Sequence, residues 1–137
     1  MKKLTALVLF VVIISLLSGC GLSMQLSSDY DKAEVESAAK EIVLLADDGD
    51  YAAVIDRLSP GVSQALTAES LKESWEPVLE KIGAHGEYKS VVVIGQADKS
   101  TGEEYAVAVI VSSHENGTSQ FTLSFNQQLD LVGLYLK

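Results

Sequence analysis

The period of the apolar residues changes once along this chain, at His85-Gly86, and that change constrains the fold more than any other feature. Before this point, apolar residues recur every three or four positions, which is typical of amphipathic helices. After it, they alternate with polar residues, which is typical of strands with one buried face. The sequence therefore predicts a helical half followed by a sheet half.

Three helices are predicted in the first half. Their expected N-caps are polar residues whose side-chain oxygens can accept from free N–H groups: Asp31, Asp50 and Thr67. Gly49 is suited to the left-handed position that ends the first helix, and Gly83 is expected to end the third. Ser59-Pro60-Gly61 is expected to break the second.

Four strands rich in Val, Ile, Phe and Tyr are predicted in the second half. They span residues 88–94, 105–113, 121–125 and 131–136. Asn116-Gly117 between the second and third is a strong hairpin signal. No connection is long enough for a crossover helix, so the sheet should be an antiparallel meander. We therefore predict an α+β fold, αααββββ, with three N-terminal helices packed on a curved four-stranded sheet.

Alternation also predicts which strand residues face the helices. The larger side chains of the second and third strands are expected to form the core face: Tyr105, Val107, Val109, Val111, Phe121, Leu123 and Phe125. The smaller side chains should form a mildly polar solvent face, or an interface that another surface can approach closely: Ala106, Ala108, Ser112, Thr122 and Ser124.

The first residues of the chain carry an export signal. Lys2-Lys3 precedes an apolar run at residues 4–17. A run of this length fits the apolar region of a secretory signal better than a membrane-spanning helix, which needs about 20 residues. Residues 1–19 are therefore predicted to be a signal peptide.

Leu17-Ser18-Gly19-Cys20 resembles the lipobox of bacterial lipoproteins. The resemblance implies cleavage before Cys20 and attachment of acyl chains such as palmitate to the chain that begins there. Residues 20–30 would then be a lipidated N-terminus and flexible tether. The alternative for Cys20 is an incidental thiol at the end of an uncleaved membrane helix.

The net charge excludes one class of partner. The chain has 10 Lys and Arg against 19 Asp and Glu. Without Lys2 and Lys3 of the leader, 8 basic groups face 19 acidic ones, a net charge of −11. Nucleic-acid binding needs clustered Lys and Arg, so no nucleic-acid partner is expected.

Several core and turn residues resemble those of the DUF3887 family, small domains related to the NTF2-like (cystatin-like) superfamily. They are Gly49-Asp50-Tyr51, Leu58, Leu71, Trp75, Leu79, Gly83, Phe125 and Val132-Gly133-Leu134. The resemblance implies an NTF2-like domain over residues 31–137, with a cone between helices and sheet. It departs from the family at residues 126–130, where a Gly-bearing turn is usual and this chain has none.

A cavity enzyme in such a cone would need an Asp, Glu or His base with Tyr or acid donors opposite. Nearly every carboxylate here falls on a predicted helix surface, cap or turn. The inward-facing candidates either line a cavity or are core residues with one satisfied hydrogen bond: Trp75, Tyr88, Tyr105 and Tyr135.

No metal site or cofactor is expected. His85 and His114 are far apart in sequence and have no Cys or Asp at ligand spacing. Residues 47–50 lack the alternating oxygen ligands and distal Glu of a calcium loop, so capping and charge repulsion explain their acidic side chains.

The sequence thus predicts an extracytoplasmic lipoprotein, anchored to the cell membrane through lipid on Cys20, with a non-catalytic binding or protein-interaction domain. We expect no enzymatic activity. A protein partner or a second copy of the chain is expected at the sheet face. The alternative is a small-ligand carrier or an isomerase- or dehydratase-like enzyme built in the cone.

Overall fold

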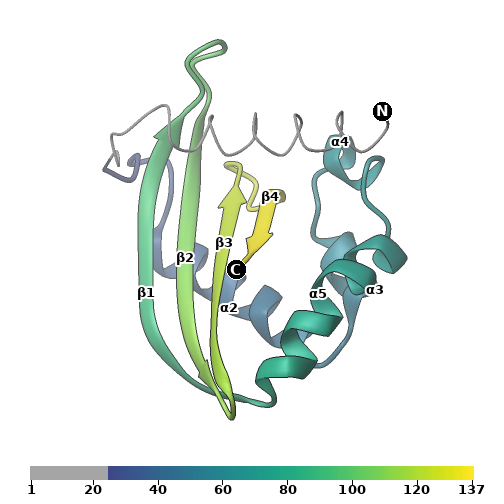
Figure 1. Ribbon diagram of the computed structural model, residues 1–137. Coiled ribbons are helices and arrows are strands. Elements are labelled where there is room, and N and C mark those ends of the chain that lie inside the picture. The colour runs from purple at the N-terminus through teal and green to yellow at the C-terminus, as the bar shows by residue number, and fades with distance from the viewer. Residues whose placement is uncertain (1–24) are drawn as a thin grey trace.

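The computed structural model describes residues 25–137, in which four helices precede four strands (Figure 1). The helices are α2 (Lys32–Asp47), α3 (Tyr51–Asp56), α4 (Pro60–Ser63) and α5 (Ala68–Ile82). The strands are β1 (His85–Ala97), β2 (Glu104–His114), β3 (Gly117–Phe125) and β4 (Leu131–Leu136). The predicted signal peptide and Cys20 lie outside the described residues.

The strands form one antiparallel sheet in the order β1-β2-β3-β4, which confirms the predicted α+β meander. The described residues contain four helices rather than the three predicted. The addition is α4, a single turn at the predicted break. Pro60 is its first residue, where the fixed φ of proline favours a helix and its missing N–H is not needed.

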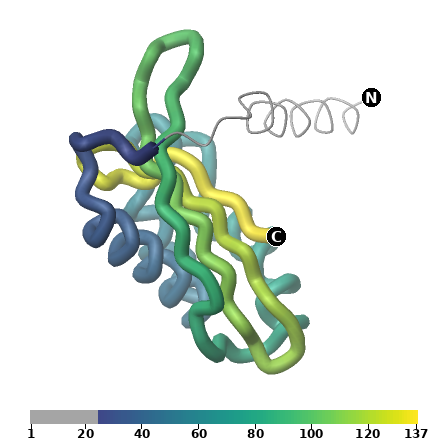
Figure 2. The backbone as a smooth tube through the Cα atoms, turned by 90° about the vertical axis from the view of Figure 1, so that its left-hand side faces the viewer, coloured from purple at the N-terminus to yellow at the C-terminus, as the bar shows by residue number. Residues whose placement is uncertain are grey.

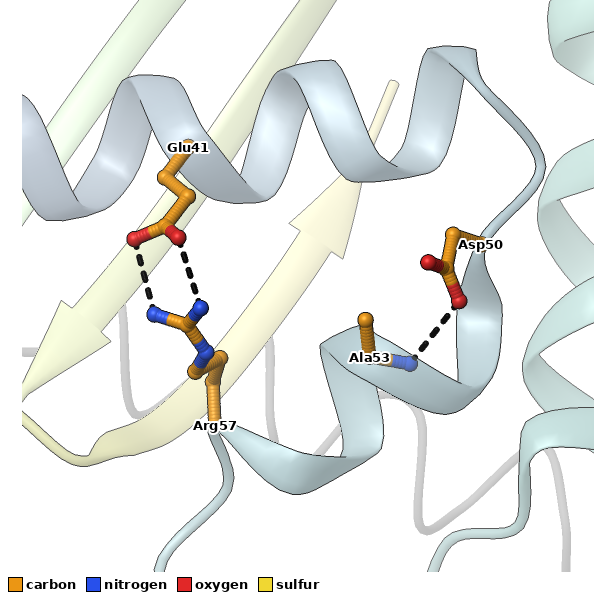
Figure 3. Close-up of polar contacts among 4 residues, drawn as sticks. All are labelled: Glu41, Asp50, Ala53 and Arg57. Atoms are coloured by element: carbon orange, nitrogen blue, oxygen red, sulfur yellow. Dashed lines mark hydrogen bonds and ion pairs between the residues drawn. The ribbon is translucent and has the colours of Figure 1, made fainter.

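The predicted caps are confirmed. Asp31 accepts from the backbone N–H of Ala33 at 2.8 Å, and Asp50 accepts from that of Ala53 at 3.2 Å (Figure 3). Thr67 and Ser70 form a reciprocal capping box. At the other ends of the helices, Gly49 and Gly83 have φ angles of 75° and 82°, positive values that glycine adopts more easily than other residues.

The helices cover one face of the sheet, with α2 packed against β1, β2 and β3 and α5 against β3. Trp75 of α5 meets Phe121 of β3 edge to face, with ring centroids 5.4 Å apart. The helix layer is also joined to β4 through the backbone. Leu131 N donates to Arg57 O, and Ser59 N donates to Leu131 O. These contacts hold β4 to the segment between α3 and α4.

The predicted core face of β2 is wrong. Its helix-facing residues are the alternate set, which pairs with the large residues of β3: Ala106 with Phe125, Ala108 with Leu123 and Ile110 with Phe121. Directly paired residues in antiparallel strands project to the same side of the sheet, so these six share the core.

The remaining β2 residues, Tyr105, Val107, Val109 and Val111, lie on the outer face, together with Thr122 and Ser124. The reason for the inversion is the register of the β2–β3 hairpin. His114 pairs with Gly117, so Ala106, Ala108 and Ile110 fall opposite the buried Phe125, Leu123 and Phe121 and share their face. Val107 is only 3% exposed but is not part of the core cluster beneath the helices.

Packing begins within the range predicted as a tether. Leu26 packs against the core, and the Tyr30 hydroxyl donates to the carbonyl oxygens of Glu104 and Phe125. Gly95 leaves room for this segment, since a Cβ there would lie 2.5 Å from Gln25 O. Figure 2 shows residues 25–30 beside β1, near the β1–β2 hairpin.

Asn126 organises the glycine-free turn between β3 and β4. Its side-chain oxygen accepts from the N–H groups of Gln128 and Asp130, and its own N–H donates to Asp130 O. Leu129 takes the left-handed conformation, with φ 62°. The hydrogen bonds of the Asn126 side chain therefore stabilise a turn in which Leu129, rather than a glycine, has the positive φ angle.

Candidate functional site

A pocket of about 380 Å³ opens at the end of the fold where both long helices finish. It is lined by Ala46–Gly49 at the end of α2, by Tyr51 of α3, by one face of α5 and by residues 83–85. In Figure 1 this end holds the connection from α5 to β1 and the β2–β3 hairpin. The pocket is therefore built by several elements that are distant in sequence.

Four side chains at this end hold buried polar atoms with no hydrogen-bond partner. They are Asp47 Oδ2, His85 Nε2, Tyr88 OH and Ser112 Oγ. Asp47 and His85 line the pocket. Tyr88 and Ser112 are paired across β1 and β2, and Ser112 is fully buried. An unpaired buried polar group costs about 1–3 kcal/mol, so this cluster is expected to take a water or ligand that supplies the missing bonds.

Asp47 is the titratable centre of this polar cluster. Burial raises the pKa of its carboxyl above the ordinary 3.8, and the nearby His85 and His114 oppose that shift. Asp47 is also the last residue of α2, and the C-terminal end of a helix disfavours a negative charge. Burial and the helix end thus both disfavour the negative charge of the Asp47 carboxylate. Carboxylates in such unfavourable surroundings are common in functional sites.

His114 is fixed by two hydrogen bonds. Its Nδ1 lies 3.0 Å from Gly83 O, and its Nε2 lies 2.8 Å from Ser119 Oγ. Because a carbonyl oxygen can only accept, Nδ1 must carry the proton that it donates to Gly83. In the neutral ring, Nε2 then accepts from the Ser119 hydroxyl. His114 therefore holds the end of α5 to the β2–β3 hairpin.

Tyr88 lies between a histidine and a lysine. The rings of His85 and Tyr88 have centroids 5.0 Å apart, and Lys40 Nζ lies 5.2 Å from the Tyr88 ring centroid. Burial, and then the charge of Asp47, raise the pKa of the Tyr88 phenol. Its hydroxyl is therefore a neutral hydrogen-bond donor close to a carboxylate.

The pocket lining is acidic. Asp48, Glu76 and Glu80 line it beside Asp47, and its one lysine, Lys72, pairs with Glu76 at 3.6 Å. The same carboxylates affect Tyr51. Burial, and then the charges of Glu76, Glu80 and Asp47, raise the pKa of its phenol. Negatively charged side chains thus line the pocket from α5 to Asp47 at the end of α2.

Two other concavities are less convincing as sites. The larger, about 570 Å³, is lined by α2 and the residue that follows it, and the other is lined by α5 alone. Each is the exposed side of one helix.

Within residues 25–137, no group of three or more His, Cys, Asp or Glu side chains is arranged to hold a metal ion. In the same range, none of the helices has the length and apolar content to cross a bilayer.

The structure separates the four aromatic residues predicted to line a cavity. Tyr88 joins the polar cluster, and Trp75 is 6% exposed within the core. Tyr105 and Tyr135 lie on the outer sheet face instead. There Tyr105 donates to Glu103 at 2.5 Å, and chiefly this bond raises the pKa of the phenol to about 12. Predicting Tyr105 to face inward is an error that follows from the inverted face of β2.

Asp47, His85, His114 and Ser112 were not predicted as site residues. In the sequence, Asp47 lies at a predicted helix end. The long distance in sequence between His85 and His114 gives no indication that they share a site. A register signal was present: His85 and His114 lie at similar distances from the predicted hairpin at residues 98–102, which pairs them across β1 and β2. That the end of α2 also lies here depends on tertiary packing.

The outer face of the sheet has no helix over it among the described residues (Figure 2). Val92 and Tyr135 are 46% and 39% exposed on it. Val109 and Thr122 lie between them, and Val111 lies on the same face two residues from Val109. The face is thus rich in β-branched side chains, rather than the small-residue surface that was predicted.

A family model described as "Protein of unknown function (DUF3887)" matches residues 39–134. The fold is similar to the NMR structure of a protein from Ruminococcus gnavus ATCC 29149, with a TM-score of 0.71 and 27% sequence identity. That similarity covers 81% of this chain and 95% of the other. The curated proteins give no match. The residues matched to the family include Asp47, His85, Tyr88 and Ser112.

Proposed function

The chain belongs to the DUF3887 family, as its residues predict, and we propose that it is a membrane-anchored extracytoplasmic lipoprotein whose domain binds a ligand without transforming it. The observation that carries the binding part is the pocket lined by Asp47 and His85, at the end of the fold where buried polar atoms of Asp47, His85, Tyr88 and Ser112 have no hydrogen-bond partner. We also propose that the fold is of the NTF2-like type, in which a cone between helices and sheet is the usual place for a ligand.

The anchoring part is supported by the sequence from Leu17 to Cys20. Two or more acyl chains make a stable anchor, whereas one chain is marginal. An acidic domain gains nothing from the negative surface of a membrane, so the lipid would supply the whole affinity.

Labelling with radioactive palmitate tests the anchor. Cys20→Ala should abolish incorporation into the chain, whereas Ser23→Ala, three residues away, should leave it unchanged. Equal labelling of Cys20→Ala and the natural chain would contradict the lipoprotein proposal.

A second candidate is an acid/base enzyme in the same pocket, and the raised pKa of Asp47 beside the Tyr88 hydroxyl favours it. The Asp47 carboxylate would take a proton from the carbon next to a ketone. Tyr88 would donate a hydrogen bond to the enolate oxygen that forms.

Cyclohexanone in D₂O distinguishes the two functions, since exchange of its α-protons can be followed by NMR. An enzyme of this type would accelerate exchange, and Asp47→Asn would remove the acceleration while Asp56→Asn would keep it. The binding proposal predicts the same exchange rate with and without the natural chain.

A further inference from the structure

We propose that the lipid on Cys20 holds the domain end-on to a lipid bilayer, with the β1–β2 hairpin next to the membrane surface and the pocket facing away from it. This inference rests on the proposed lipid anchor and adds the orientation of the domain, which an anchor alone does not determine. The part that meets the bilayer consists of residues 25–29 and 98–104, which we call the hairpin end.

The first described residues are fastened to the hairpin end. The backbone of Gln25 runs so close to Gly95 of β1 that a Cβ at Gly95 would lie 2.5 Å from Gln25 O. Leu26 packs against the core, and the Tyr30 hydroxyl donates to Glu104 O at 2.8 Å. Gln25 is therefore held beside the last residues of β1, close to the hairpin (Figure 2).

The connection from the lipid to Gln25 is short. Cys20 and Gln25 are five residues apart, and five residues span at most about 18 Å when fully extended. The acyl chains on Cys20 would be buried in the bilayer, so the backbone of Cys20 would lie at the membrane surface. Gln25 can then be no more than about 18 Å from that surface.

The domain is longer than this connection. Gly95 and His85 are ten residues apart on β1, which is about 30 Å at the usual rise of a strand. His85 lines the pocket, and Figure 1 shows the β1–β2 and β2–β3 hairpins at opposite ends of the sheet. Turning the pocket toward the bilayer would carry Gln25 about 30 Å from the surface, beyond the reach of the connection. That orientation is excluded for a chain anchored at Cys20.

Charge separates the two orientations that remain, end-on and lying flat. Residues 25–137 hold 8 basic and 19 acidic groups, a net charge of −11, so an anionic bilayer repels them. Salt screens this repulsion beyond about 8 Å, so only the groups next to the surface contribute. Lying flat brings a whole side of the domain into that layer, whereas end-on contact brings the hairpin end alone. The end-on orientation therefore has the lower electrostatic cost.

The hairpin end meets the bilayer without entering it. Residues 98–104 contain no large apolar side chain, and Asp98 stabilises their turn by accepting from Ser100 N at 2.8 Å. Charged groups are costly within hydrocarbon, and four exposed carboxylates lie at this end against Lys99: Asp29, Asp98, Glu103 and Glu104. The hairpin therefore acts as a spacer at the headgroups, and the pocket opens toward the aqueous phase.

Energy transfer to the bilayer tests this orientation. The chain has one cysteine, Cys20, whose thiol the lipid would occupy, so an introduced cysteine alone should react with a maleimide dye. The two sites are Ser100→Cys in the β1–β2 hairpin and Thr118→Cys at the β2–β3 hairpin, and both residues are exposed. The full lipidated chain, purified from membranes, is placed in vesicles of phosphatidylglycerol and phosphatidylcholine that carry acceptor dye on their headgroups.

We expect transfer from Ser100→Cys to be at least about twofold more efficient than transfer from Thr118→Cys, because the second site lies a strand length further from the bilayer. Vesicles of phosphatidylcholine alone should narrow the difference, since they remove the repulsion. Equal transfer from the two sites, or greater transfer from Thr118→Cys, would overturn the end-on orientation.

Two further variants test whether the short connection is the cause. Insertion of about 20 Gly and Ser residues after Ser23 gives a flexible linker longer than the domain, and it should remove most of the difference. Gly95→Ala, which displaces Gln25, should narrow it, whereas Gly61→Ala should leave it unchanged. An undiminished difference in the insertion variant would contradict the role of the connection.

The natural chain separates failure of the orientation from failure of the anchor. If it takes up dye at Cys20 or does not bind vesicles, the lipid anchor is contradicted, and the orientation with it. If it stays unlabelled and binds vesicles while the two labelled sites give equal transfer, the orientation alone is overturned.

Discussion

The imidazole rings of His85 and His114 meet edge to face, with centroids 5.4 Å apart, although the residues are 29 positions apart in sequence. They are partners in the β1–β2 register. The pairing brings both rings close enough to Asp47 that each opposes the rise in its pKa. One strand register thus gathers the titratable groups of the pocket end.

Removing the His114 side chain should destabilise the domain. His114→Ala deletes two hydrogen bonds at a residue that is 8% exposed and leaves Gly83 O and Ser119 Oγ without partners. We expect a loss of about 2–4 kcal/mol, since each unsatisfied buried group costs about 1–3 kcal/mol. Ser119→Ala, which removes one bond, should cost about half as much. Urea unfolding measures both, and equal stability of His114→Ala and the natural chain would contradict the role given to His114.

Asp47→Asn should stabilise the domain near neutral pH. The pKa of Asp47 is raised above 3.8 by folding, so the folded state binds this proton more tightly than the unfolded state does. Stability from this group is therefore present at low pH and is lost as pH rises through the folded-state pKa. Asparagine stays neutral, so the gain in melting temperature should appear above that pKa and shrink below pH 3.8. Asp56→Asn is the control, and a gain that grows at low pH would contradict the assignment.

Gly95→Ala should displace the N-terminal segment. The new Cβ would meet Gln25 O at 2.5 Å and Leu26 Cα at 3.2 Å, and backbone cannot yield as a flexible side chain can. We expect a loss of about 1–3 kcal/mol and faster amide exchange at Tyr30. Gly61→Ala has nothing within 4 Å and should be neutral or slightly stabilising. Unchanged exchange in Gly95→Ala would show that residues 25–30 do not pack as described.

The ion pair between α2 and α3 should contribute little. Arg57 contacts Glu41 through two bonds of 2.7 and 2.6 Å, but both side chains are nearly half exposed (Figure 3). Glu41→Gln should cost about 0.2–1 kcal/mol in urea unfolding, and less in 1 M salt. A loss above 2 kcal/mol, unchanged by salt, would contradict this estimate.

The outer sheet face should mediate self-association. Val92, 46% exposed, lies there with Val109 and Val111, and no helix of the described residues covers them. Light scattering of the full chain in detergent, corrected for the micelle, should give a dimer. Val92→Lys should give a monomer, whereas Val78→Lys, on the exposed side of α5, should leave the dimer intact. A monomeric natural chain would contradict the prediction.

Local signals explain what could be predicted from the sequence. Asp31, Asp50 and Thr67 cap helices through bonds within a few residues, and Asn116 and Gly117 lie at the β2–β3 turn. These features depend on neighbouring residues only, so the pattern of residue types was sufficient to place them.

Features that depend on distant residues were predicted poorly. Hydrophobicity favoured Val over Ala as the core set of β2, but the pairing of β2 with β3 decides the face, because it sets Ala106 and Ile110 opposite the buried Phe125 and Phe121. The pocket depends on where α2 and α5 end relative to β1, which no sequence spacing encodes. Asp47 was therefore seen as a residue at a helix end, and its burial against His85 was missed.

Intact-mass spectrometry of the chain purified from membranes tests the central proposal, an anchored extracytoplasmic domain, most directly. The proposal predicts a chain that has lost residues 1–19, begins at Cys20 and carries the added mass of at least two acyl chains. A mass equal to that of all 137 residues, or a chain with a free thiol at Cys20, would contradict it.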